Sequence, residues 1–279
     1  MMKIRNYICN YKDGKTNDPL EDKIDVSTIF SDVNSYKKAA EYLSKNNPFV
    51  FFPITNTLEA ELQGALINEN SLIRVKNPII TDVEELFSLK EFDYTVPHYK
   101  IMTECFDSEY DKPLAYEMTG FYTFLSFIIP AEKIFRAFRK NLETEKALAD
   151  LFLKNYFSFI KALNCFNIRL ISLADPAASV DIIGPAALER TINNFYAPLL
   201  DYILCNTKFS IYLCPKLSLA MEDLGFLKGQ TIETGKKNVQ DAIKDLAAEK
   251  KIFGNICINL KTEINRIKLF EFIKGETDE

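Results

Sequence analysis

Hydrophobic positions in this chain fall into two alternating patterns. Short continuous apolar runs cover residues 48–53, 112–119, 167–174, 209–214 and 252–258, and such runs predict buried strands. Between them, residues 35–44, 143–163, 185–204 and 239–248 carry apolar side chains at helical spacing, as do Leu58, Leu62 and Leu66. Strands that alternate with helices are typical of a parallel α/β sheet or barrel.

The helical segment 185–204 has the clearest stripe. Its apolar members recur at intervals of three and four residues and are Leu188, Ile192, Phe195, Tyr196, Leu199 and Ile203. Pro185 stands where the first turn of a helix tolerates proline. Pro198 lies inside the stripe, and because proline has no N–H to donate, it predicts a kink or a local break.

Composition narrows the classes of protein. The 279 residues carry 47% hydrophobic and 26% charged side chains, which suits one soluble globular domain. The net charge of −5 argues against a nucleic-acid binder, which normally presents a basic face. The start of the chain lacks the apolar segment of a signal peptide, and the uncharged stretch 118–131 is too short to span a bilayer.

The six cysteines favour a reducing compartment. They are scattered and form no CxxC pair, at Cys9, Cys105, Cys165, Cys205, Cys214 and Cys257. We therefore expect a soluble cytoplasmic protein without disulfides or membrane contact. The glycine-rich phosphate-binding motifs GxGxxG and GxxxxGK[ST] do not occur, which removes the simplest nucleotide-binding interpretations.

Candidate site residues stand at the predicted ends of strands. Asp175 follows one strand, and barrel enzymes place their chemistry at that end. The alternative role for Asp175 is to cap the turn at Pro176. Gly120 and Ser179 have the same two interpretations, a ligand contact or a local turn. Glu61, near the start of a helix, is either a ligand contact or a carboxylate favoured by the helix dipole.

Four segments in order resemble one superfamily. The run 171–179, ISLADPAAS, followed by IIGP, resembles the "ADPxAS…isP" element of the uroporphyrinogen decarboxylase and methylcobamide:coenzyme M methyltransferase superfamily. Segment 57–65 resembles its "tveaEalGa" stretch, 120–126 its "GPfTLA" element, and 211–215, IYLCP, lies where the family has "IHxCG". The matches span about residues 50–260, and the decarboxylase branch's arginine-rich motif is absent.

The resemblance implies a single (β/α)8 TIM-type barrel over residues 1–279, shortened at its carboxyl end. Residues 1–45 would form an N-terminal extension and the first helix, 267–273 a shortened last strand, and 275–279 a frayed tail. In the methyltransferase branch, zinc is bound through His-x-Cys and a further cysteine. Here Tyr212 replaces the histidine and only Cys214 remains, so no zinc is expected; Cys214 and Cys257 would be its ligands if zinc were bound.

Two functions follow from this resemblance. In the first, the protein moves a methyl group between a methylcobamide on a partner protein and a small thiol-type acceptor, with Asp175 orienting the ligand and Cys214 contributing a thiol. Binding contacts would come from Gly120, Tyr122, Ser179, Tyr212 and Glu61. In the second, the barrel is catalytically degenerate and serves as a ligand-binding or regulatory partner of a corrinoid protein.

Overall fold

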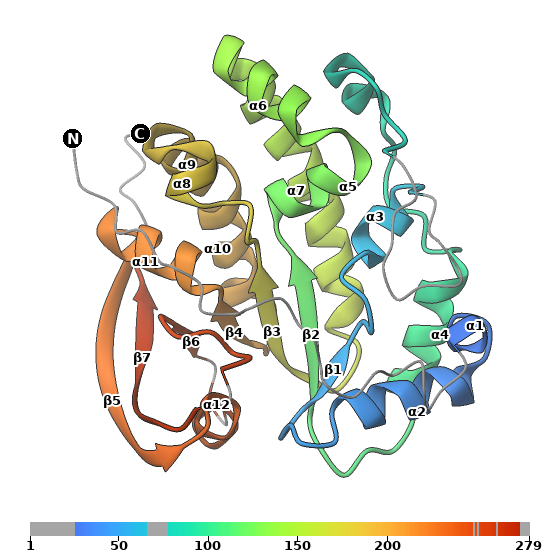
Figure 1. Ribbon diagram of the computed structural model, residues 1–279, viewed down its shortest axis with the longest axis vertical. Helices are drawn as coiled ribbons and strands as arrows, with labels where there is room; N and C mark the ends of the chain where they lie inside the picture. The colour runs from blue at the N-terminus through green and yellow to red at the C-terminus, as the bar shows by residue number, and fades with distance from the viewer. Residues whose placement is uncertain (1–25, 66–77, 248, 250, 261, 274–279) are drawn as a thin grey trace.

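The computed structural model describes residues 26–65, 78–247, 249, 251–260 and 262–273 (Figure 1). The predicted extension up to residue 25, Leu66 and the tail after residue 273 lie outside the described residues. The α-helices are α1 (Val26–Ile29), α2 (Val33–Leu43), α3 (Leu58–Leu62), α4 (Pro97–Phe106), α5 (Phe121–Ile128), α6 (Ala131–Lys140), α7 (Leu142–Leu163), α8 (Val180–Ile183), α9 (Pro185–Thr191), α10 (Ala197–Asn206), α11 (Pro215–Asp223) and α12 (Val239–Leu246). A 3-10 turn covers Val83–Ser88.

The strands form one mixed sheet of seven members in the order β1-β2-β3-β4-β6-β7-β5. They are β1 (Val50–Phe52), β2 (Leu114–Thr119), β3 (Ile168–Ala174), β4 (Ser210–Leu213), β5 (Leu227–Lys237), β6 (Ile252–Gly254) and β7 (Ile264–Phe272). Neighbours from β1 to β6 are parallel, whereas β7 runs antiparallel to both β6 and β5. The predicted alternation of strands and helices is confirmed over the parallel part.

The sheet departs from the expected barrel at its far side. Residues 267–273 were expected as a shortened parallel last strand, but β7 is longer and antiparallel, and it pairs with β5, which the hydrophobic pattern did not predict. β5 was not predicted because its sequence, LKGQTIETGKK, is polar and mostly exposed. Within the described residues the strand order is linear, with β1 and β5 at its two ends, so closure into an eight-stranded barrel is not confirmed.

The two faces of the sheet bury different cores. One face, which carries Tyr116, Met118 and Leu173, packs into the large core formed with the helices. The other, called here the second face, carries Ala115, Leu170 and Tyr212, which cluster with Val239 and Ile243 of α12. Because side chains alternate along a strand, the odd positions of β2 and the even positions of β3 and β4 that follow the register shift at Leu114/Ala115 point to the second face. Ile168, which precedes that shift, lies in the large core.

The predicted break at Pro198 is confirmed. α9 is followed by a π-helical turn at Ile192–Tyr196, and α10 begins at Ala197 with the proline in its first turn. Proline cannot donate to the preceding turn and its ring clashes there, so the helix widens locally and restarts. This turn places Tyr196 at the end of β3.

The only histidine in the chain ties three helices together. His98 of α4, 2% exposed, has Nδ1 3.1 Å from both carboxylate oxygens of Glu61 in α3, and Nε2 2.9 Å from the hydroxyl of Tyr36 in α2. The Tyr36 hydroxyl accepts a hydrogen bond from the Ile54 N–H, just after β1. Both ring nitrogens are therefore occupied in positioning the segment that joins β1 to α3.

None of the described helices is long and apolar enough to cross a lipid bilayer.

Candidate functional site

The ends of the parallel strands meet at one edge of the sheet. Figure 1 shows the arrowheads of β2 and β3 pointing toward the end of the molecule that carries α5, α6, α8 and α9. Gly120 follows β2 and donates its N–H to Ala174 at 2.8 Å, while the N–H of Cys214, after β4, donates to Leu173 at 3.0 Å. Cys257 follows β6 after Asn255 and Ile256. The structure thus gathers Gly120, Asp175 and Cys214 at one edge, as their strand-end positions predicted.

Asp175 is the centre of this edge, and it is fully buried. Its Oδ2 accepts from the N–H of Tyr122 at 2.9 Å and from the hydroxyl of Tyr196. Its Oδ1 accepts from the N–H of Thr123 at 3.0 Å, from the Thr123 hydroxyl at 2.6 Å, and from the N–H of Ala178 at 3.2 Å. The carboxylate therefore joins the end of β3 to the first turn of α5 and to the π-helical turn.

The close approach of α5 to Asp175 explains the glycine at position 120. A Cβ atom at Gly120 would lie 2.4 Å from the Cβ of Asp175, which no side chain can accommodate. Burial raises the pKa of Asp175, and its five hydrogen bonds oppose that rise. Both oxygens of the Asp175 carboxylate thus accept hydrogen bonds from the protein, and the bond from the Ala178 N–H is the turn-capping contact named above as the alternative role.

Other predicted binding residues are also buried. Glu61 is 4% exposed and accepts from the Thr57 hydroxyl at 2.6 Å in addition to His98. Ser179, 1% exposed, stands at the N-terminus of the short helix α8. Tyr122, 2% exposed, has its hydroxyl 3.2 Å from that of Thr191.

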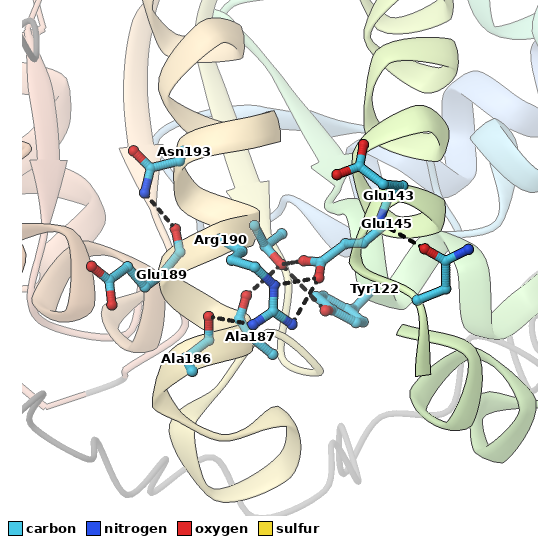
Figure 2. A network of polar contacts seen from close by, with 10 residues as sticks. Tyr122, Glu143, Glu145, Ala186, Ala187, Glu189, Arg190 and Asn193 are labelled. Atoms are coloured by element: carbon cyan, nitrogen blue, oxygen red, sulfur yellow. Dashed lines mark hydrogen bonds and ion pairs between the residues drawn. The ribbon is translucent and has the colours of Figure 1, made fainter. Parts of the chain in front are cut away.

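Tyr122 belongs to the polar network shown in Figure 2. Glu145 of α7 is fully buried and accepts from Nε and Nη2 of Arg190 in α9, each at 3.0 Å, and from the Thr191 hydroxyl at 2.7 Å. The cavity beside it, lined by Tyr122, Arg139 and Arg190, measures about 20 Å³, which suits one water molecule and no organic ligand. This network fastens α7 to α9.

Larger hollows lie away from this edge. One of about 760 Å³ opens between α10 and β5, β6 and β7, and another of about 610 Å³ lies over Glu233 and Arg266. The Arg266 and Glu233 side chains pair with each other at 2.6 Å and are both exposed, so the second hollow is open surface. Neither contains a residue that follows a parallel strand from β1 to β4.

Two polar side chains on the second face, Glu117 and Ser172, were not predicted from the sequence, and they lie in line with the predicted Tyr212. Glu117 of β2 is in register with Ser172 of β3, which is in register with Tyr212 of β4. These three residues are called here the polar row. Neighbouring strands lie about 4.8 Å apart, so the row runs perpendicular to the strands across β2, β3 and β4. Glu117 was detectable as the one charged residue inside the apolar strand LAYEMT.

The polar row has a buried floor and an accessible rim. Ser172 and Tyr212 are 3% and 2% exposed, whereas Glu117, Ala174 and Cys214 are half-buried. Ala174 and Cys214 lie one step nearer the strand ends on the same face, since each comes two residues after a member of the row. Solvent therefore reaches the second face at Glu117, Ala174 and Cys214.

Glu117 has no internal compensation for its charge. Among the described residues its carboxylate makes no hydrogen bond and no ion pair, and burial raises its pKa. A carboxylate that loses water without gaining donors destabilises its own ionised form. This sets Glu117 apart from Asp175, whose burial is compensated by five donors.

Glu59 of α3 is the other poorly satisfied acid at this edge. It is fully buried; its Oε1 accepts from the Tyr116 hydroxyl at 3.1 Å and from the Thr119 N–H at 3.2 Å, while Oε2 contacts no donor in the described structure. Burial raises the pKa of Glu59 to about 7. Burial without a donor for Oε2 makes the ionised form of Glu59 unfavourable, so this side chain affects the stability of the fold.

The residues at Cys214 do not fit a zinc centre. A catalytic zinc site needs three protein ligands, usually nitrogen or sulfur donors. The described part of the chain contains no group of three His, Cys, Asp or Glu side chains arranged to hold a metal. His98 lies in α4, and both of its ring nitrogens form hydrogen bonds there. It therefore cannot serve as the zinc ligand that the family's histidine provides at the position of Tyr212.

Comparison with known proteins gives a likeness of fold. No family model matches the chain, and no curated protein matches it. A solved methyltransferase from Methanosarcina mazei superposes with a TM-score of 0.51 at 19% sequence identity, over 70% of this chain and 60% of that one. The likeness is one of fold. The chain spans about 60% of the length of that methyltransferase.

Replacing Asp175 by Asn is expected to destabilise the fold. The amide keeps one acceptor oxygen and turns an NH2 group toward donors, so at least two hydrogen bonds to a buried charged group are lost. We expect the free energy of unfolding to fall by roughly 3 kcal/mol, measured by urea denaturation. Asp181→Asn is the control: Asp181 is exposed and pairs with the half-buried Lys216 at 3.6 Å, and its replacement should change the free energy of unfolding by less than about 1 kcal/mol. Equal small effects would show that Asp175 does not hold this edge together.

Glu59→Gln is expected to flatten the dependence of stability on pH. The pKa of Glu59 is raised from 4.5 to about 7 in the fold, so its favourable protonated state persists at low pH and is lost as pH rises through about 7. The free energy of unfolding of Glu59→Gln, measured relative to that of the native chain, should rise by roughly 3 kcal/mol between about pH 4 and about pH 8. Glu132 is exposed, so the free energy of unfolding of Glu132→Gln relative to the native chain should not change over the same pH range. A pH-independent difference would contradict the assignment.

Proposed function

We propose that this chain is a methyltransferase-like protein that binds a small organic ligand on the second face of its sheet and acts beside a corrinoid protein that carries the methyl group. The observation that carries the proposal is the uncompensated carboxylate of Glu117 at the accessible rim of the polar row. Uncompensated polar groups beside the ends of parallel strands are typical of ligand sites in α/β folds.

Two further features support a binding role. The fold is similar to that of a methyltransferase, which supports a methylated compound as the ligand. The corrinoid partner comes from the sequence resemblance described above. Of the side chains expected to perform chemistry, Asp175 accepts hydrogen bonds on both carboxylate oxygens from the protein, and Cys214 has Tyr212 where the resemblance requires a histidine. We therefore derive no catalytic step through zinc.

Methyl transfer by Cys214 itself is the second candidate. Cys214 is half-buried on the same face as the polar row, two residues after Tyr212, and is not in a disulfide. Its thiol would then meet a ligand bound at the row. This candidate requires Cys214 to react as a thiolate, since the thiolate and not the thiol is the nucleophile.

The purified protein is expected to bind less than one equivalent of zinc, with no difference between the native chain and Cys214→Ala. Tyr212→His adds a nitrogen donor two residues from Cys214 on the same side of β4, so a partial gain in zinc affinity is expected. Metal analysis by mass spectrometry and competition with a chelator measure both. One equivalent of zinc that disappears in Cys214→Ala would instead favour methyl transfer.

Ligand binding at the second face is tested by blocking it. Ala174→Leu adds bulk at the rim of the polar row, while Ala186→Leu adds the same bulk on an exposed position of α9. In a screen of small organic fragments by saturation-transfer NMR, hits seen with the native chain should be lost in Ala174→Leu and kept in Ala186→Leu. Hits that survive both changes would place the ligand site elsewhere and refute the proposal.

A further inference from the structure

We infer that the ligand of the second face is an organic cation, a protonated amine or a quaternary ammonium group, whose positive charge is held by the Glu117 carboxylate. The inference rests on the proposed binding role and adds the chemical class of the ligand. It depends on the juxtaposition of one unpaired carboxylate with aromatic side chains on a partly accessible face.

Within the described part of the chain, Glu117 supplies the charge of the site. Among the described residues, no lysine, arginine or histidine pairs with it, and no second acid forms a contact with it. Removing a carboxylate from water costs free energy unless an opposite charge or several donors replace the water. A bound cation offsets that cost, whereas an anion would add repulsion and a neutral ligand would leave the charge uncompensated.

Aromatic neighbours favour an organic cation over a metal ion. Phe51 of β1 is half-buried and in register with Ala115, two residues before Glu117 on the same face, so it is the aromatic side chain that a ligand at Glu117 would meet. Tyr212 and Phe253 are on the same face but are buried in its core, two and three strands from Glu117. Aromatic rings attract cations through their faces and provide apolar contact for methyl groups. A metal ion needs three or more oxygen, nitrogen or sulfur ligands, and the described residues offer no such group here.

The test compares two probes of the same shape. Choline carries a trimethylammonium group, and its neutral carbon analogue carries a tert-butyl group in that place. Both are titrated into the full-length protein, and affinity is read from chemical-shift changes in two-dimensional NMR spectra. Choline is expected to bind at least about tenfold more tightly than the neutral analogue, because only choline compensates the carboxylate.

Glu117→Gln keeps the size of the side chain and removes its charge. We expect it to abolish the preference for choline while the protein stays folded, with an unchanged or higher melting temperature, since an uncompensated charge is lost. Glu271→Gln is the matched control, the same change at an exposed position of β7, and should keep the preference. The folded state of both variants is checked by the same spectra.

The outcomes separate this inference from the function it rests on. If the neutral analogue binds as tightly as choline and both are blocked by Ala174→Leu, the second face is a ligand site but the cation assignment is wrong. If Glu117→Gln retains the preference, the charge is held by another group and the inference also falls. If neither probe binds the native chain and the fragments bind Ala174→Leu as they bind the native chain, both the assignment of the ligand as a cation and the ligand site on the second face are refuted.

Discussion

The burial of one carboxylate organises the end of this sheet. Asp175 has lost all contact with water, so its oxygens have to find donors within the protein, and they find them in the first turn of α5, in the turn after β3 and in the π-helical turn. Each donor fixes something else. The approach of α5 excludes any side chain at position 120, and the position of Tyr196 depends on the helix widening before Pro198.

The contrast between Asp175 and Glu117 separates structure from function. Both are acids in or beside the central strands, and burial raises the pKa of each. Asp175 is satisfied from inside, which makes it part of the framework. Glu117 is left without a partner in the described residues, which makes it the acid that a ligand would satisfy. The proposed site therefore follows from an unmet hydrogen-bonding capacity and not from position at the end of a strand.

The sequence predicted those parts of the fold that depend on local patterns. The apolar runs at 48–53, 167–174 and 209–214 became β1, β3 and β4, and Pro198 broke its helix because proline acts on its own turn. β5 was missed because an edge strand exposed on both sides has no hydrophobic pattern, and the direction of β7 depends on its partners. The role of Asp175 could not be read locally, since four of its five hydrogen bonds come from residues more than twenty positions away.

Those separations also bear on how the chain folds. Tyr122 and Thr123 precede Asp175 by 53 and 52 residues, and Tyr196 follows it by 21. Until these three segments converge, the Asp175 carboxylate keeps its water, because a partly assembled edge would bury it without enough donors. Folding intermediates with only some of these hydrogen bonds are thereby disfavoured. Because a long loop must close before each of these distant hydrogen bonds forms, folding is slower. The same aspartate that orders the native edge thus sharpens the cooperativity of its formation.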